Sequence, residues 1–229
     1  MTIKAIVFDK DGTLFDFSAT WVAWAESFLS RLAGGDRDLT RRLGHRIGFD
    51  TETRQFLPGS VAIADTPPDI VEALLPLLPG MTADEVLALL NSEAEAAPQV
   101  EAVPLARVLG DLRARGLRLG VATNDAEVPA RAHITSAGVG HHFEFVAGSD
   151  SGHGAKPAPG QLLAFASFLG LAPGQIAMVG DSCHDLAAGR AAGMSTIGVL
   201  TGMAGADELT PLADVILPDI GHIAGWLDR

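Results

Sequence analysis

The chain has 229 residues, of which 48% are hydrophobic and 19% are charged, and its formal net charge at pH 7 is −12. This composition excludes a disordered chain and predicts one substantial core with a smaller second unit. The acidic surplus argues against nucleic-acid binding, which needs a basic surface. No apolar run approaches the ~20 residues of a membrane span, and the N-terminal run is too short for a signal peptide. We therefore expect a cytoplasmic protein without a membrane or nucleic-acid partner.

The first predicted element is a short strand over Ala5–Phe8, an apolar run without a polar interruption. Such a run is typical of a strand buried on both faces of a parallel sheet. Asp9 and Asp11 follow its carboxyl end, where open α/β sheets bind their ligands. Paired carboxylates at this place suggest a reacting centre that contains a cation or a shared proton. The alternative is a turn in which each aspartate bonds the nearby backbone, and the residues alone leave both interpretations open.

The next part of the chain, residues 17–101, shows helical periodicity without alternating strands. Apolar residues recur at helical spacing in most of its segments, and Thr82 with Glu85 forms a capping-box pattern. Helices are expected over 20–32, 38–47, 69–78 and 82–97. We interpret residues 17–101 as an all-helical cap domain inserted after the first strand.

From residue 102 onward, apolar strand runs alternate with helical segments. Further strands are expected over 117–122, 143–147, 176–179, 196–200 and 215–217. Helices are expected over 105–112, 129–137, 159–169 and 185–192, with a short one at the end of the chain. This alternation predicts a doubly wound, mostly parallel sheet. Residues 1–16 and 102–229 would then form one α/β core domain, Rossmann-like in architecture.

Polar residues follow two of these strands and a glycine-rich loop. Thr123-Asn124 ends one apolar run, Lys156 lies in a Gly-Ala-Lys-Pro loop, and Gly180-Asp181-Ser182-Cys183-His184-Asp185 ends another run. Together with Asp9-Lys10-Asp11-Gly12-Thr13 and in this order, they resemble the four motifs of the haloacid dehalogenase superfamily. The resemblance covers the start and second half of the chain, and it is nearest to the phosphoglycolate phosphatase-like members.

The resemblance implies a Mg²⁺-dependent phosphatase that acts through an aspartyl-phosphate. It implies that Asp9 is the nucleophile and that Asp11 protonates the leaving oxygen and later activates water. The Asp9 and Asp181 side chains and the Asp11 carbonyl would hold the metal, which suits a hard cation such as Mg²⁺. Asp185, one turn beyond Asp181, could orient this site; the alternative for both residues is helix N-capping.

The resemblance also implies a phosphate-binding role for Thr123, Asn124 and Lys156. A strand-end hydroxyl and amide can donate hydrogen bonds to phosphoryl oxygens, and the ammonium group would offset the charge of Asp9 and the phosphoryl group. The plain alternatives are a helix cap for the first two and a solvated surface position for the lysine. The chain has only three lysines, Lys4, Lys10 and Lys156, which favours the functional interpretation of Lys156.

Individual residues narrow the choice among the members of the superfamily. Asp11 argues against the dehalogenase branch, and the absence of lysine from 17–101 excludes phosphonate hydrolases that need a cap lysine. A phosphoglycolate phosphatase-like enzyme for a small phosphorylated metabolite is favoured. A β-phosphoglucomutase-type phosphomutase and a non-catalytic binding protein of the same fold are the alternatives. We expect a monomer or homodimer.

Two arginines of the predicted cap, Arg42 and Arg46, share one helix face. We hypothesise that this face recognises an anionic part of the substrate, such as a carboxylate. The alternative is a solvated helix face, because exposed arginines are common.

Overall fold

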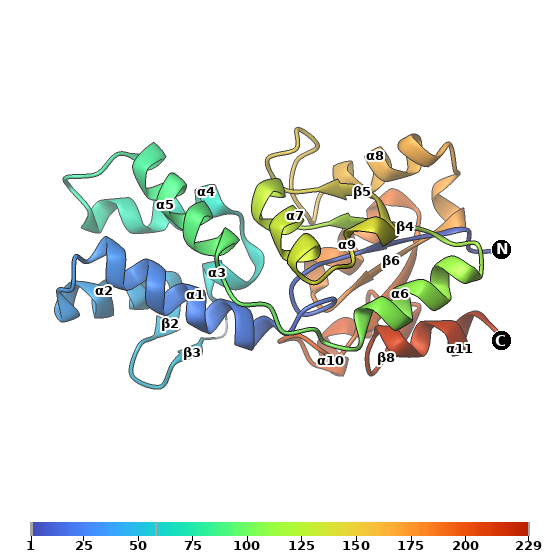
Figure 1. The fold of residues 1–229 in the computed structure, drawn as a ribbon, viewed down its shortest axis with the longest axis horizontal. Helices are drawn as coiled ribbons and strands as arrows, with labels where there is room; N and C mark the ends of the chain where they lie inside the picture. Colours follow the sequence, from blue (N-terminus) through green and yellow to red (C-terminus); the bar gives the residue numbers. More distant parts are fainter. Residues whose placement is uncertain (1, 58, 229) are drawn as a thin grey trace.

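The computed structural model describes residues 2–57 and 59–228 (Figure 1). The α/β part comprises β1 (Ala5–Phe8), α6 (Leu105–Ala114), β4 (Arg118–Ala122), α7 (Glu127–Ser136), β5 (Phe143–Ala147), α8 (Gly160–Leu169), β6 (Ile176–Gly180), α9 (Cys183–Ala192), β7 (Ser195–Val199), α10 (Ala206–Leu209), β8 (Val215–Leu217) and α11 (Ile223–Leu227). The helical part comprises α1 (Phe17–Leu32), α2 (Arg37–Ile47), β2 (Phe49–Asp50), β3 (Gln55–Phe56), α3 (Val61–Ala64), α4 (Pro67–Leu74) and α5 (Ala83–Glu95).

The large sheet has six strands in the order β5-β4-β1-β6-β7-β8, and every pair is parallel. Strand β1 lies in the interior of the sheet between β4 and β6, so that Ala5 faces Arg118 on one side and Ile176 on the other. All carboxyl ends of the strands therefore meet at one edge. This confirms the predicted doubly wound, parallel architecture and brings the segments after β1, β4 and β6 together.

Both faces of the sheet are covered, which explains the uninterrupted apolar sequence of β1. Ile6 and Phe8 belong to a buried cluster that includes residues of α6, α7 and α11. Ala5 and Val7 belong to a second cluster with residues of α8 and α9. Because alternate strand residues point to opposite faces, the two helical layers each receive two side chains. Figure 1 shows α6 and α11 on one side of the sheet and α8 on the other.

The helical part has a buried cluster of its own, which contains only residues 17–97; the two clusters of the sheet contain none of these. Its helices lie close to the predicted segments, but α1 begins at Phe17 because Asp16 caps it by accepting a hydrogen bond from the Ala19 N–H at 2.7 Å. The short antiparallel pair of β2 and β3, joined by a turn, was not foreseen. The predicted domain boundaries at 16/17 and 101/102 stay a prediction.

Within the part of the chain that the structure describes, none of the helices combines the length and the apolar character needed to cross a membrane.

We predict that Phe28→Ala in the helical part lowers the free energy of unfolding by about 3–5 kcal/mol, because Phe28 is fully buried and stacks on Trp24. Urea denaturation followed by circular dichroism measures this loss. The matched control is Val128→Ala, since this valine is 64% exposed and should change the free energy by less than about 0.5 kcal/mol. Equal losses in the two variants would contradict the assigned core.

Candidate active site

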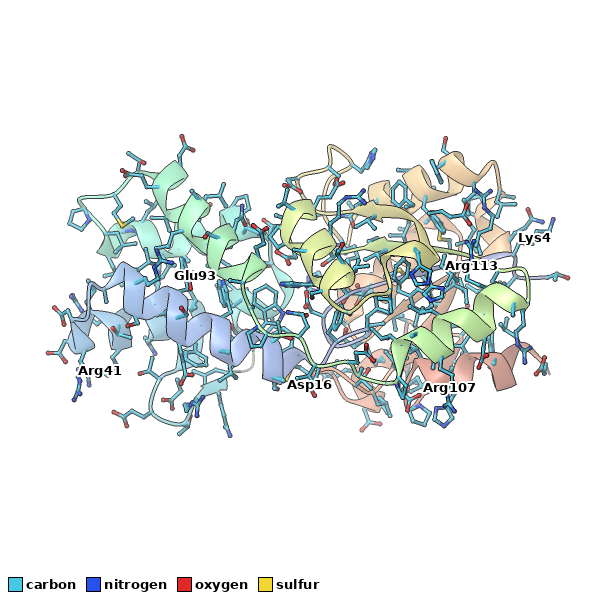
Figure 2. The ribbon with its side chains drawn as sticks, viewed as in Figure 1. Lys4, Asp16, Arg41, Glu93, Arg107 and Arg113 are labelled. Atoms are coloured by element: carbon cyan, nitrogen blue, oxygen red, sulfur yellow. The ribbon has the colours of Figure 1, made fainter. Side chains whose placement is uncertain are left out.

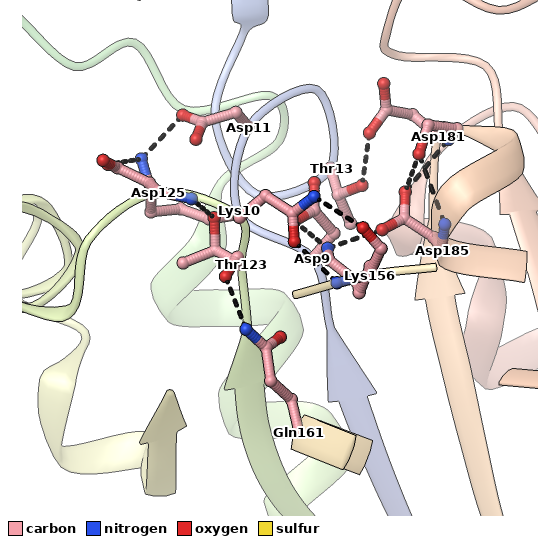
Figure 3. Close-up of polar contacts among 12 residues, drawn as sticks. Asp9, Lys10, Asp11, Thr13, Thr123, Asp125, Lys156, Gln161, Asp181 and Asp185 are labelled. Atoms are coloured by element: carbon pink, nitrogen blue, oxygen red, sulfur yellow. Dashed lines mark hydrogen bonds and ion pairs between the residues drawn. The ribbon is translucent and has the colours of Figure 1, made fainter. Parts of the chain in front are cut away.

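A buried ion-pair cluster lies at the carboxyl edge of the sheet (Figure 3). The ammonium group of Lys156 donates to Asp9 Oδ1 at 2.6 Å and to Asp185 Oδ1 at 2.5 Å. Asp181 lies in the same group, because Asp9, Asp181 and Asp185 each offer a carboxylate oxygen within 4.8 Å of the others. The structure thus brings together four residues that the sequence singled out from three separate segments.

Asp185 takes part in the capping box of α9 and also contacts Lys156. Ser182 is the N-cap of α9, and its backbone N–H donates to Asp185 Oδ2 at 3.0 Å while the Asp185 N–H donates to Ser182 Oγ at 3.3 Å. The other oxygen, Oδ1, accepts the hydrogen bond from Lys156. The capping box therefore fixes the carboxylate that in turn holds the lysine.

Two glycines allow the backbone to close around the carboxylate of Asp181. A Cβ atom at Gly12 would lie 2.4 Å from Asp181 Oδ2, and one at Gly202 would lie 1.7 Å from the same atom. Gly12 also has φ of +78°, which L side chains rarely adopt. The hydroxyl of Thr13 donates to Asp181 Oδ1 at 3.1 Å. Gly202 was not predicted, because it follows β7 by a few residues and carries no motif of its own.

The cluster has more negative than positive charge. Burial raises the pKa of Asp9 to about 7, and the charges of Asp185 and Asp11 add to this rise while Lys156 opposes it. The pKa of Asp181 lies well above its ordinary value because of burial and of repulsion by Asp9 and Asp185. Three ionised carboxylates and one ammonium group leave two negative charges, which one divalent cation would neutralise. The residues present therefore fit Mg²⁺, whose preferred ligands are oxygen atoms.

Thr123 and Asn124 lie beside this cluster at the end of β4. The side-chain amide of Asn124 donates to the Lys156 carbonyl at 2.9 Å, and its Oδ1 accepts from the Lys156 N–H at 2.8 Å. Asn124 thereby fixes the loop that carries the lysine. Thr123 is buried, and Gln161 donates to its carbonyl oxygen at 2.9 Å. The phosphate-binding role of Thr123, Asn124 and Lys156 stays a prediction.

Asp11 lies in a second ion-pair cluster, on the other side of Asp9 (Figure 3). Its carboxylate accepts a hydrogen bond from Lys10 Nζ at 2.7 Å. The same ammonium group lies 3.4 Å from Asp125 Oδ2 and 3.0 Å from His133 Nδ1. Asp125 and His133 were missed by the sequence reasoning. The available signal was Lys10 itself, because a lysine at the end of a buried strand needs carboxylate partners.

Arg42 and Arg46 stand apart from both clusters. They are exposed on α2, and Arg46 Nε donates to the carbonyl of Ala73 at 2.9 Å. In Figure 2 their neighbour Arg41 lies at the outer end of the helical part, away from the sheet. The hypothesis that the two arginines recognise the substrate stays a prediction.

Comparison with known proteins identifies the family to which the chain is similar. A family model for haloacid dehalogenase-like hydrolases matches residues 3–193. The probable phosphatase IndB of Dickeya dadantii is 30% identical over 220 residues, which cover 93% of this chain and 88% of IndB. The phosphoglycolate phosphatase of Rhodospirillum rubrum is 37% identical over 120 residues, which cover 52% of this chain and 50% of that enzyme.

A solved structure from Haemophilus somnus, described as a predicted phosphoglycolate phosphatase, matches the fold with a TM-score of 0.76 at 21% identity. The match covers 99% of this chain and 98% of the other. The matched segment spans about half the length of the Rhodospirillum rubrum enzyme but most of IndB. The likeness at this level of identity concerns the fold.

The raised pKa of Asp9 predicts how the stability of the metal-free protein depends on pH. The pKa of about 7 in the folded state exceeds the ordinary 3.8, so the folded state binds this proton more tightly than the unfolded state. The stabilisation that comes from protonated Asp9 is fully present below about pH 4 and is lost as the pH rises to about 7. We therefore expect the free energy of unfolding in EDTA to fall across this window, and saturating Mg²⁺ to offset the fall.

Urea denaturation at a series of pH values measures this effect. Asp9→Asn should make the decline in EDTA shallower, although Asp125, whose pKa burial raises to about 6, keeps part of it. A decline that is equally steep in Asp9→Asn and the unmodified protein would contradict the assignment.

Proposed function

The chain belongs to the haloacid dehalogenase-like hydrolases, and we propose that it is a Mg²⁺-dependent phosphatase whose Asp9 carries the phosphoryl group of a small metabolite. The observation that supports this most is the contact between Lys156 Nζ and Asp9 Oδ1, at 2.6 Å, inside a group of three buried carboxylates. A carboxylate that is held by an ammonium group and lies beside a cation-binding cluster can approach an anionic phosphate ester. Without these positive charges nearby, the negative charge of the carboxylate would repel the ester.

The reaction proceeds in two halves. In the first, a carboxylate oxygen of Asp9 forms a bond to phosphorus while the bond between phosphorus and the ester oxygen breaks, and the proton of the Asp11 carboxyl group goes to the leaving oxygen. In the second, water attacks phosphorus and gives a proton to Asp11, and the bond between Asp9 and phosphorus breaks. Inorganic phosphate leaves, and both residues return to their starting forms.

The other residues of the site neutralise and orient charge. Lys156 offsets the charge of Asp9 and of the phosphoryl oxygens, while Asp185 holds the lysine in place. Thr123 and Asn124 would donate hydrogen bonds to the phosphoryl oxygens. Asp9, Asp181 and the carbonyl of Asp11 would hold Mg²⁺, which cancels negative charge on the phosphoryl group when bound.

A phosphoglycolate-like metabolite is the proposed substrate. The support comes from the Rhodospirillum rubrum relative, which bears the name phosphoglycolate phosphatase. Residues 17–101 form the proposed cap, and they contain no lysine with which a phosphomutase of the β-phosphoglucomutase type could orient sugar hydroxyls. A screen of phosphorylated metabolites distinguishes the two reactions, because a phosphatase releases inorganic phosphate and a mutase interconverts isomers.

We predict that Asp9→Asn lowers Mg²⁺-dependent hydrolysis of p-nitrophenyl phosphate by roughly 10⁴-fold or more, since removing a nucleophile abolishes the covalent route. Steady-state release of p-nitrophenol measures the loss. The control is Lys4→Met, at an exposed lysine whose side chain lies outside the site, which should retain the activity of the unmodified enzyme. Equal turnover in Asp9→Asn and the unmodified enzyme, or no turnover in either, would overturn the proposed function.

A further inference from the structure

We propose that Lys10 is a positioning residue for proton transfer: it holds the carboxyl group of Asp11 and takes its own position from the helical part of the chain. This inference rests on the proposed function, in which Asp11 is the acid and base. Nothing in the four-motif pattern requires a lysine between the two aspartates.

The ammonium group of Lys10 contacts three polar side chains. Lys10 is fully buried, and its Nζ lies 2.7 Å from Asp11 Oδ1, 3.0 Å from His133 Nδ1 and 3.4 Å from Asp125 Oδ2. An ammonium group only donates, so the hydrogen bonds to Asp11 and His133 orient it, while Asp125 adds an ion pair. The hydrogen bond from Nζ to Asp11 Oδ1 needs only an acceptor oxygen, so it holds the Asp11 carboxyl group in place both with and without its proton.

His133 connects this ammonium group to the helical part. Its Nε2 lies 2.6 Å from the carbonyl oxygen of Ala94 in α5. A carbonyl oxygen can only accept, so the ring proton lies on Nε2 and Nδ1 is left to accept from Lys10. The pKa of His133 falls to about 4 because of burial and the charge of Lys10, so the ring stays neutral in this arrangement.

Helix α1 of the helical part also contacts Lys10. The ring of Trp21 in α1 lies under the ammonium group, with Nζ 5.5 Å from the ring centroid. This distance is within the range of a cation–π interaction. Helices α1 and α5 therefore both act on Lys10, one directly and one through His133. A displacement of these helices relative to the sheet would disturb the group that orients Asp11.

The two lysines at the sheet edge thus serve different carboxylates. Lys156 contacts Asp9 and Asp185, whereas Lys10 contacts Asp11 and Asp125. Removing Lys156 would affect every phosphate ester, because each needs the nucleophile. In the first half of the reaction, removing Lys10 should slow only those esters whose leaving oxygen must receive a proton. The second half, in which Asp11 takes a proton from water, is common to all esters and does not contribute to kcat/KM. Alkyl phosphates need this proton, whereas p-nitrophenyl phosphate and acetyl phosphate release stable anions without it.

The test compares Lys10→Met with the unmodified enzyme on these two classes of substrate. Methionine keeps most of the length of the side chain and removes its charge. We expect kcat/KM for the best alkyl phosphate, which reports only the steps up to departure of the leaving group, to fall by about 10²-fold or more, the usual value of a general acid. The kcat/KM for p-nitrophenyl phosphate and acetyl phosphate should fall by less than about 5-fold, because their leaving groups need little acid catalysis. Lys4→Met is the matched control and should change neither rate.

Further variants test whether a loss of folding explains the lost activity. Lys10→Met leaves Asp11 and Asp125 without a counter-charge, so the double variant Lys10→Met/Asp125→Asn removes one of these charges as well. It should recover the melting temperature without recovering alkyl phosphate hydrolysis. His133→Phe removes both ring nitrogens and should reproduce the selective loss in weaker form. An equal loss of kcat/KM for all esters in these variants would show that Lys10 is only structural and would overturn the proposal.

A crystal structure of Lys10→Met gives a readout that does not depend on activity. We expect the carboxylate of Asp11 to leave the position it occupies beside residue 10. An unchanged carboxylate would overturn this inference while leaving the proposed function intact. Inactivity of the unmodified enzyme on every ester would instead overturn the proposed function.

Discussion

The ammonium group of Lys156, held between the carboxylates of Asp9 and Asp185, sets the balance of charge at the carboxyl edge of the sheet. The parallel sheet makes this contact possible, because β1 lies between β4 and β6 and their carboxyl ends meet at one edge. Carboxylates that come so close in a buried place would repel one another and take up protons. The lysine offsets one negative charge, and the two that remain are what a divalent cation can neutralise.

The need to hold these buried carboxylates together explains the presence of residues that take no part in the reaction. Asp185 uses one oxygen to cap α9 and the other to hold the lysine, so the helix start fixes the charge at the centre of the site. Gly12 and Gly202 leave room for the carboxylate of Asp181, where any side chain would collide with it. A second buried lysine, Lys10, offsets the charges of Asp11 and Asp125 beside the first cluster. The arrangement matches the needs of phosphoryl transfer, in which positioning and charge neutralisation do most of the catalytic work.

Most of the fold could be predicted from local sequence. The apolar run of β1 and the alternation after residue 102 identified the parallel sheet, because burial on both faces leaves a continuous apolar signature. Asp9, Asp11, Thr123, Asn124 and Asp181 could be proposed as site residues because they follow strand ends, whereas Lys156 was proposed from the resemblance of its loop to a family motif. Asp125 and His133 could not be found in this way, because their roles come from contact with Lys10 across the tertiary structure. The contact of Lys10 with Trp21 likewise depends on how the helical part packs, which no local pattern encodes.

In the proposed reaction, the carboxylate of Asp9 becomes covalently bonded to phosphorus during turnover. Peptide mass spectrometry of enzyme quenched with acid during steady-state hydrolysis, after borohydride reduction to mark an acyl phosphate, detects this bond. We expect the reduced product at residue 9 and at no other aspartate. Turnover without any labelled residue, or a label on Asp11 or Asp181, would contradict the proposed reaction.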